Sequence, residues 1–424
     1  MKGDQPRFFD VIDDKSFRDL MRTAQRRALT WSELLEHPLP PALSPRETRR
    51  ALESLGRCLG VHLFEGSNGE LLWYRRTYEI EDALAKIGAG AALLATALEG
   101  SRRDGIAEDL RHREATGALA LANFEAVPRD SCALEPSHTK RVLGAYREID
   151  RTLPSLADEA LTARRIVAIA ERLISCAGFE ASAHARWRIG TPPERAAILE
   201  RLDVVCTWVN NPPSNDDTLL LRGMLAGAAL RELSAFGCIN GLVSSLVSRL
   251  CYLKDGNAAL AAIAPCAPLA QWVAGEDETA PCTYDEYAAT RMNTPSDLTI
   301  CQTINARCLV AALEEAQSLI RHAQAQTQSM ESLFESNPLI NERQRRTLLL
   351  LSHHPDQALS IGDYQRDHGT SYATARRDLL SLEGLDFVKS SVRNKRLVFE
   401  ANRALFIAVK TAEPENDGHE GEAL

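Results

Sequence analysis

The sequence predicts a mainly α-helical protein with more than one domain. Its 424 residues exceed one typical domain, and at about 150 residues per domain they predict two or three. Hydrophobic residues make up 45% and charged residues 25%, an ordinary globular composition, while aromatic residues reach only 6%. Abundant Ala, Leu and Arg favour helices over sheets. Apolar residues recur at helical spacing over 83–98, 163–176, 196–209, 219–233, 242–253 and 299–325.

The segment 15–78 predicts three helices. The first is expected over 15–29, where Phe17, Leu20 and Met21 share one face. The second and third each begin with the spacing of a capping box, in which a Ser or Thr and a Glu three residues later satisfy free backbone amides. The two boxes are Thr30 with Glu33 and Ser44 with Glu47.

A hairpin is expected directly after these helices. Two short apolar runs, 61–64 and 71–74, flank a turn that contains Asn68 and Gly69. Three helices followed by a hairpin is the order of a winged helix, so we expect one over residues 1–80. The third helix of a winged helix can enter the major groove, which makes Arg46, Arg49 and Arg50 candidate DNA contacts. Winged helices also dock proteins or dimerise, and that alternative stays open.

The same order recurs near the other end, where we expect a second winged helix over 336–408. Helices are predicted over 341–351, after Ser360, and over 371–382, followed by short strands at 387–389 and 396–400. The segment 409–424 is acidic and has few large apolar residues, which predicts disorder. The residues between the two modules, 81–335, are expected to form a helical core.

The third helix and the hairpin of the C-terminal module carry candidate DNA contacts. Arginine can bond guanine O6 and N7 with two hydrogen bonds, and a basic hairpin suits phosphate contact. A solvated arginine-rich helix face is the alternative interpretation. The candidates are Ser371, Tyr372, Thr374, Arg376 and Arg377 on the helix, and Lys389, Arg393, Lys395 and Arg396 on the hairpin.

The overall charge of −9 argues mildly against nucleic-acid binding, but the charge is uneven. Residues 15–78 hold 11 Lys and Arg against 7 Asp and Glu, and residues 341–400 hold 10 against 8. Because DNA affinity depends on the local surface that faces phosphate, the overall sign does not exclude it.

Two stretches resemble the Fic family. The run from Leu339 to Gln344 is similar to the "LNERQ" that often begins the C-terminal winged helix of Fic proteins. The run from Leu233 to Leu242 resembles the Fic active-site loop, I-H-P-F-x-(D/E)-G-N-G-R. The resemblance covers roughly residues 85–400 and implies a helical Fic-like core. In that family the loop transfers a nucleotidyl group, usually AMP, to a protein hydroxyl.

The loop departs from the family pattern at each reactive position. Phe236, Asn240 and Gly241 match it. The general base, the metal-binding acid, the first glycine and the two phosphate arginines are replaced by Ser234, Cys238, Ile239, Leu242 and Ser245. The resemblance therefore implies a degenerate Fic loop that is catalytically inactive, with no metal and no cofactor. An AMP-transferase with an unorthodox loop is the enzymatic alternative.

The leading hypothesis is a transcriptional regulator that binds double-stranded DNA as a homodimer, with the Fic-like core as a scaffold. A non-enzymatic antitoxin or adaptor is a further alternative. No signal peptide and no apolar run of about 18 residues is found, so we expect a cytoplasmic protein without membrane contact. The ten cysteines show no pairing pattern, which predicts reduced, buried thiols.

Overall fold

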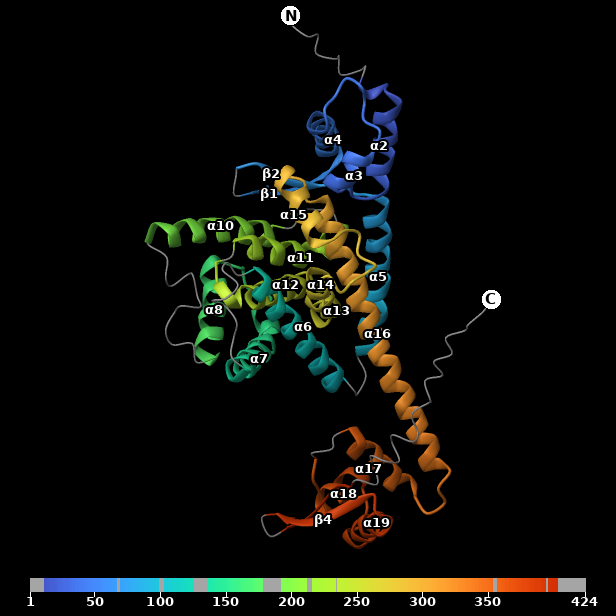
Figure 1. Ribbon diagram of the computed structural model, residues 1–424. Helices are drawn as coiled ribbons and strands as arrows, with labels where there is room; N and C mark the ends of the chain where they lie inside the picture. The colour runs from blue at the N-terminus through green and yellow to red at the C-terminus, as the bar shows by residue number, and fades with distance from the viewer. Residues whose placement is uncertain are drawn as a thin grey trace, which may run out of the picture. The chain divides into compact units, whose positions relative to one another are not determined.

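The computed structural model is mainly helical and divides into two units, Met1–Gln317 and Ser318–Leu424 (Figure 1). It describes residues 11–66, 69–98, 103–125, 136–177, 192–211, 216–233, 235–353, 357–393 and 396–402. The predicted disorder of 409–424 lies outside these residues. The boundary falls within the long helix α16 (Thr299–Glu335), about twenty residues before the domain boundary that we expected at 335.

The larger unit begins with the expected three helices and hairpin. Their bounds are α2 (Lys15–Arg26), α3 (Trp31–Glu36), α4 (Pro45–Leu59), β1 (Val61–Glu65) and β2 (Leu71–Tyr74). Both predicted capping boxes are present: Ser44 Oγ accepts from the Glu47 amide, and Thr30 Oγ1 accepts from the Glu33 amide. Local sequence signals therefore fix where these helices begin.

The helices that follow form the core of this unit, and all six segments that we expected to be helical are helical. Their bounds are α5 (Tyr78–Leu98), α6 (Arg103–Glu125), α7 (Pro136–Asp150), α8 (Ala163–Ala177), α10 (Pro192–Asn210), α11 (Asp216–Leu233), α12 (Asn240–Lys254), α13 (Ala258–Ala262), α14 (Cys266–Ala274) and α15 (Tyr284–Asn293), with 3₁₀ turns η2 (Leu153–Leu156) and η3 (Gly237–Ile239).

Helix α12 is the centre of the core. Every residue from Asn240 to Tyr252 is buried, and the helix packs on α11, α6 and α13 (Figure 1). The contact with α11 is close because Gly227 has no side chain. A Cβ at Gly227 would lie 2.2 Å from Ser248 Oγ of α12. This pair of helices therefore holds the loop between them in a dense interior.

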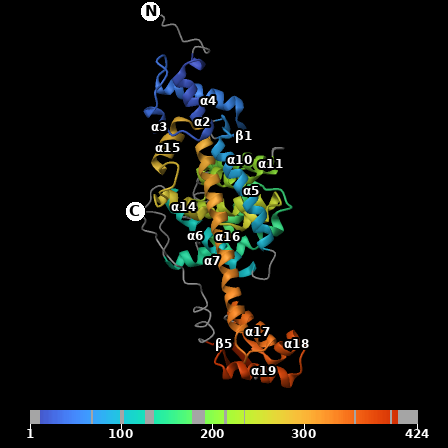
Figure 2. The ribbon, with the colours of Figure 1, turned by 90° about the vertical axis from the view of Figure 1, so that its right-hand side faces the viewer.

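The first module is joined to the core through its second strand. The Trp73 amide donates to Ser296 O at 3.0 Å, and the Leu298 amide donates to Trp73 O at 2.7 Å. The segment before α16 thus lies beside β2 like a further strand. Helix α3 also packs on α15, and the two lie side by side in Figure 2. The module is part of the larger unit.

The smaller unit repeats the order of helices and hairpin, with one added strand. Its elements are α17 (Glu342–His353), β3 (Leu359–Ser360), α18 (Ile361–His368), α19 (Tyr372–Gly384), β4 (Val388–Arg393) and β5 (Arg396–Ala401). The antiparallel sheet has the order β3-β5-β4, with Ser390 opposite Phe399. The strand β3 was not expected, because two residues are too short for a periodic signal.

A separate core holds this second unit together. Its buried side chains include Phe334 from the end of α16, Leu348, Leu379 and Phe399. Gly369 ends α18 in the left-handed region, with φ of 58°, where other residues are strained. The tight turn at Gly369 lets α19 begin at Tyr372.

None of the described helices combines the length with the apolar composition that a membrane span requires. Of the eight cysteines that the structure describes, six are buried and none forms a disulfide. Cys58 and Cys176 are exposed, so the expectation of buried thiols is wrong at these two positions.

Candidate nucleic-acid interface

The first turns of α19 present the candidate side chains of the C-terminal module. Arg376 and Arg377 are exposed, and so is Tyr372, with 57% of its surface accessible. Ser371 is the N-cap: its Oγ accepts from the Thr374 amide at 3.2 Å. Ser371 therefore has a structural role in starting the helix, whereas the arginines and Tyr372 point away from the core.

The opposite face of α19 is anchored by Asp378, a buried residue that sequence reasoning missed. Its carboxylate accepts from Arg343 Nε at 2.9 Å, from Tyr364 Oη at 3.2 Å and from Asn341 Nδ2 at 3.3 Å. Gln344 Nε2 donates to the Asp378 carbonyl at 2.9 Å. The Asn-Glu-Arg-Gln run thus links α17 to α19, and this fixes which face of α19 is exposed.

The basic residues of this module fall into two groups. On α17 and α18 they are paired with acids: Arg343 with Asp378, Arg345 with Glu335 and Glu342, Arg346 with Glu342, and Arg366 with Asp363. On α19 and the hairpin, Arg376, Arg377, Lys389 and Arg396 are exposed and form no ion pair with any described residue. Unpaired positive charge therefore gathers on the third helix and the hairpin.

The hairpin has its own internal contacts. Arg393 pairs with Glu400 across the two strands, which neutralises one of the predicted phosphate contacts. The Ser390 amide donates to Glu383 Oε1 at 2.9 Å, so β4 is tied to the end of α19. Lys395 lies outside the described residues. Lys389 and Arg396 remain as exposed cations at the two ends of the hairpin's described strands.

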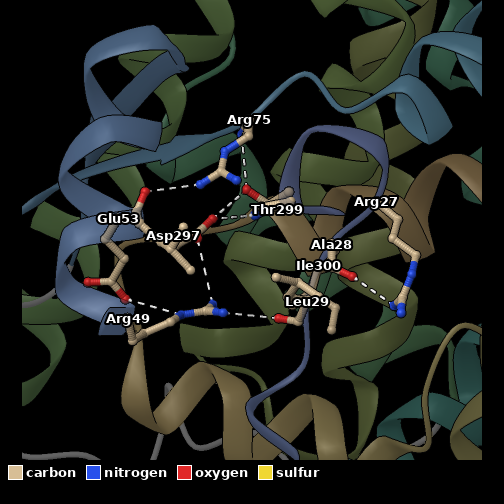
Figure 3. Close-up of a pocket in the computed structure, with 11 residues that line it drawn as sticks. Arg27, Ala28, Leu29, Arg49, Glu53, Arg75, Asp297, Thr299 and Ile300 are labelled. Carbon is tan, nitrogen blue, oxygen red and sulfur yellow. Dashed lines mark hydrogen bonds and ion pairs between the residues drawn. The ribbon is translucent and has the colours of Figure 1, made fainter. Parts of the chain in front are cut away.

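The N-terminal module places Arg49 differently from our prediction. Arg49 is only 8% exposed, and its guanidinium points inward (Figure 3). Nη1 donates to Leu29 O at 3.1 Å, Nη2 donates to Thr294 Oγ1 at 3.3 Å, and Asp297 Oδ2 is 3.8 Å away. Burial raises the pKa of the neighbouring Glu53 carboxyl, while Arg49 opposes that rise. Arg49 is therefore an internal link, and its predicted DNA contact is wrong.

The rest of this module is only partly exposed. Arg46 and Arg50 of α4 are exposed, and their DNA contact stays a prediction. Arg75, which follows the hairpin, is turned inward: its Nη2 donates to Leu52 O, and burial lowers the pKa of its guanidinium. Phe64 of β1 packs on Trp208 of α10, with ring centroids 5.2 Å apart. The N-terminal hairpin therefore packs against the helical core.

The stretch that resembles the Fic loop is internal. Phe236 and Leu242 are fully buried, and Gly241 is buried with them. Asn240 Oδ1 accepts from the Phe236 amide, and its Nδ2 donates to the carbonyls of Leu230 and Arg231. The matching asparagine thus fastens the loop to the end of α11. Ser234 and the side chain of Cys238 lie outside the described residues.

A buried polar cluster lies behind this loop. Ser245, at the position of the family's second arginine, donates to Glu114 Oε1 of α6 at 2.5 Å and lies 2.7 Å from Tyr146 Oη. Glu114 Oε2 accepts from the Cys266 amide. Burial raises the pKa of Tyr146 well above its ordinary value. The cluster joins four helices and is closed to solvent, so it is structural.

No described group of three or more His, Cys, Asp or Glu residues could hold a metal ion. The chain matches no protein-family model, and no curated protein matches it significantly. Function is therefore inferred from the chain's own surfaces.

Proposed function

We propose that the protein binds double-stranded DNA through its C-terminal module and acts in the cytoplasm as a transcriptional regulator. In this proposal the module is a winged helix: α19 enters the major groove and the hairpin β4–β5 lies along the backbone. The observation that carries it is the gathering of unpaired cations on α19 and the hairpin, beside α17 and α18 whose arginines are paired.

The exposed face of α19 has the chemistry for this contact. Tyr372 and Arg376 are one turn apart and share a face, with Arg377 beside them. An arginine can read guanine through two hydrogen bonds, and its neighbour on the helix can reach a phosphate. Asp378, buried on the other side, holds this face outward.

The larger unit serves in this proposal as a scaffold. We expect the Fic-like core to be catalytically inactive, because the base, the acid and both arginines of the family are replaced. Its role would be dimerisation, since two modules on one dimer would bind two half-sites and gain affinity from being linked.

The decisive experiment selects DNA with the purified full chain from random duplexes and measures the affinity for the selected site by fluorescence anisotropy. Arg376→Ala and Arg377→Ala are each expected to cost about 1–3 kcal/mol in binding the selected site. Arg345→Ala and Arg366→Ala are matched controls, because each also removes one positive charge from the module. They are expected to leave affinity nearly unchanged.

Two outcomes contradict the proposal. One is the absence of any enriched sequence. The other is an equal effect of all four substitutions, which would mean that only net charge matters. A protein-docking winged helix is the rival interpretation, and it predicts that neither Arg376→Ala nor Arg377→Ala changes DNA binding.

A further inference from the structure

A second site lies within the larger unit, outside the proposed DNA contacts. A pocket of about 600 Å³ opens between α11, α14, α15 and α16. This volume falls within the range of about 300–1,000 Å³ that is typical of small-molecule sites. None of the residues from Ala235 to Leu242, the loop that resembles the Fic motif, lines it. The pocket is therefore separate from that loop and from the C-terminal module.

Aromatic rings form one wall of the pocket. Trp272, Tyr284 and Tyr287 make a cluster in which the ring centroids are 5.5 to 6.0 Å apart. Trp272 Nε1 donates to Cys282 O at 2.7 Å, which holds the indole in place. Ile304 adds aliphatic surface. A flat ring can pack against this wall, because aromatic side chains offer large rigid contact areas.

Asn305 gives the pocket a polar group whose hydrogen bonds the protein does not complete. It lines the pocket from α16 and is 2% exposed. Its Nδ2 donates to Cys301 Sγ at 3.7 Å, a weak acceptor, and no described residue donates to its Oδ1. A buried amide oxygen without a donor costs free energy, and a ligand with an N–H group would recover that cost.

The amide and the aromatic wall meet at Cys301, which also lines the pocket. The Cys301 thiol accepts from Asn305 and makes a side-chain hydrogen bond with Tyr287. Burial raises the pKa of Tyr287 well above its ordinary value and also raises the pKa of Cys301, so both groups are uncharged near neutral pH. Because Cys301 touches both residues, one small ligand can reach the Tyr287 ring and the Asn305 amide together.

The charged residues that line the pocket are paired within the protein. Arg291 Nη2 donates to Glu232 at 2.9 Å, and its Nη1 donates to the carbonyls of Pro295 and Asp297. Arg231 also has an interaction partner in the protein. Burying a charged ligand group without a partner is costly. The pocket therefore favours a neutral ligand.

We infer that this pocket binds a neutral, planar heterocycle that carries a hydrogen-bond donor beside an acceptor on one edge, as a lactam does. The rings pack on Trp272 and Tyr287, the ring N–H donates to Asn305 Oδ1, and the ring carbonyl accepts from Asn305 Nδ2. A primary amide suits such an edge, because it holds an acceptor and a donor side by side. This binding site goes beyond DNA binding and does not depend on it.

The probe is 2-quinolinone, a neutral bicyclic lactam, and binding to the full chain is measured by titration calorimetry. Coumarin is its matched control, because it has the same rings and carbonyl but an oxygen in place of the N–H. We expect saturable binding of 2-quinolinone, about tenfold tighter than that of coumarin, since coumarin leaves Asn305 Oδ1 without a donor. The anion 1-naphthoate, of similar size, should bind more weakly than 2-quinolinone.

Asn305→Leu tests the amide without opening a cavity, because leucine has a similar shape and needs no hydrogen bond. The variant should bind 2-quinolinone about tenfold more weakly than the unaltered protein does, and it should bind 2-quinolinone and coumarin with nearly equal affinity. A merely structural role of Asn305 would change the binding of both compounds by the same factor.

Ala288→Trp tests the place of binding, because it fills the pocket from α15 and should abolish binding of 2-quinolinone. Leu93→Trp, on the exposed face of α5, adds an indole outside the pocket and should leave binding unchanged. The inference is overturned if 2-quinolinone shows no saturable binding, if 1-naphthoate binds more tightly, if Asn305→Leu keeps the preference over coumarin, or if Ala288→Trp leaves binding intact.

Discussion

The two terminal modules share one order of elements but differ in how much of it the rest of the chain covers. In the N-terminal module the hairpin packs on α10 and on the segment before α16, and Arg49 of the third helix is buried. In the C-terminal module the third helix and the hairpin carry exposed cations without ion partners. The same local pattern therefore serves internal packing in one case and offers a charged surface in the other.

The difference lies in long-range partners. Arg49 is buried because Thr294 and Asp297, about 245 residues later, reach its guanidinium. Nothing near Arg49 in the sequence signals these partners. An arginine on a third helix thus indicates a DNA contact only when the rest of the fold leaves that helix uncovered.

The largest expected effect is on the anchor of the exposed helix. Asp378→Ala removes a buried carboxylate that accepts hydrogen bonds from Arg343, Tyr364 and Asn341. These three donors then have no acceptor at this position. Leaving a buried donor such as Tyr364 Oη without an acceptor costs about 1–3 kcal/mol, and the loss of the ion pair with the partly exposed Arg343 adds to it. We expect faster hydrogen exchange in peptides from α17 to α19 of the full chain.

Asp367→Ala, at an exposed position of the same module, is the control and should leave exchange unchanged. Hydrogen exchange is the right measurement because all five tryptophans precede Ser318, so tryptophan fluorescence reports the larger unit. Equal exchange in the two variants would mean that Asp378 does not hold α19.

Arg49→Ala tests the opposite module. It should lower the free energy of unfolding of the larger unit by about 1.5–3 kcal/mol, the range for hydrogen bonds to a charged group. Urea unfolding followed by tryptophan fluorescence measures this. DNA affinity should not change, because the side chain is buried. Arg46→Ala and Arg50→Ala, on the exposed face, should leave stability unchanged, and a loss of DNA affinity in Arg49→Ala alone would refute the internal role.

The hairpin of the C-terminal module should contact phosphate independently of sequence. Removing Lys389 and Arg396 together should weaken binding to selected and random DNA alike. The slope of log affinity against log salt should become shallower by about 0.9 per lost contact. Arg393→Ala should change the slope less, because Glu400 already pairs with Arg393. An unchanged slope in the double variant would remove the hairpin from the interface.

These cases show what the sequence could predict. Helix starts followed from capping boxes at Thr30 and Ser44, because the signal lies within four residues. The short strand β3, the burial of Arg49 and the pocket around Trp272 could not be predicted, because each depends on segments that meet only in the folded chain. The role of Asp378 could have been predicted from the sequence. Asp378 is an acid on the otherwise apolar, inward face of α19, and a buried acid needs a hydrogen-bond or ionic partner.

The smallest expected effect concerns pH and the packing of α17 on α18. His368 Nε2 lies 3.0 Å from Thr347 Oγ1, and its ring lies 4.4 Å from that of Tyr364. Burial, the largest cause, lowers the pKa of His368 below its ordinary 6.5, with Arg343 and Arg346 acting in the same direction against Asp367 and Asp378. The folded state therefore prefers neutral His368, and its contribution to stability is present above pH 6.5 and is lost as pH falls through the lowered pKa.

Protection factors for peptides from α17 and α18, corrected for intrinsic exchange, should fall between pH 7.5 and pH 5. In His368→Gln, which keeps a polar side chain but does not titrate, that fall should be smaller. An equal or larger fall in the variant would show that another group controls the acid response of this module.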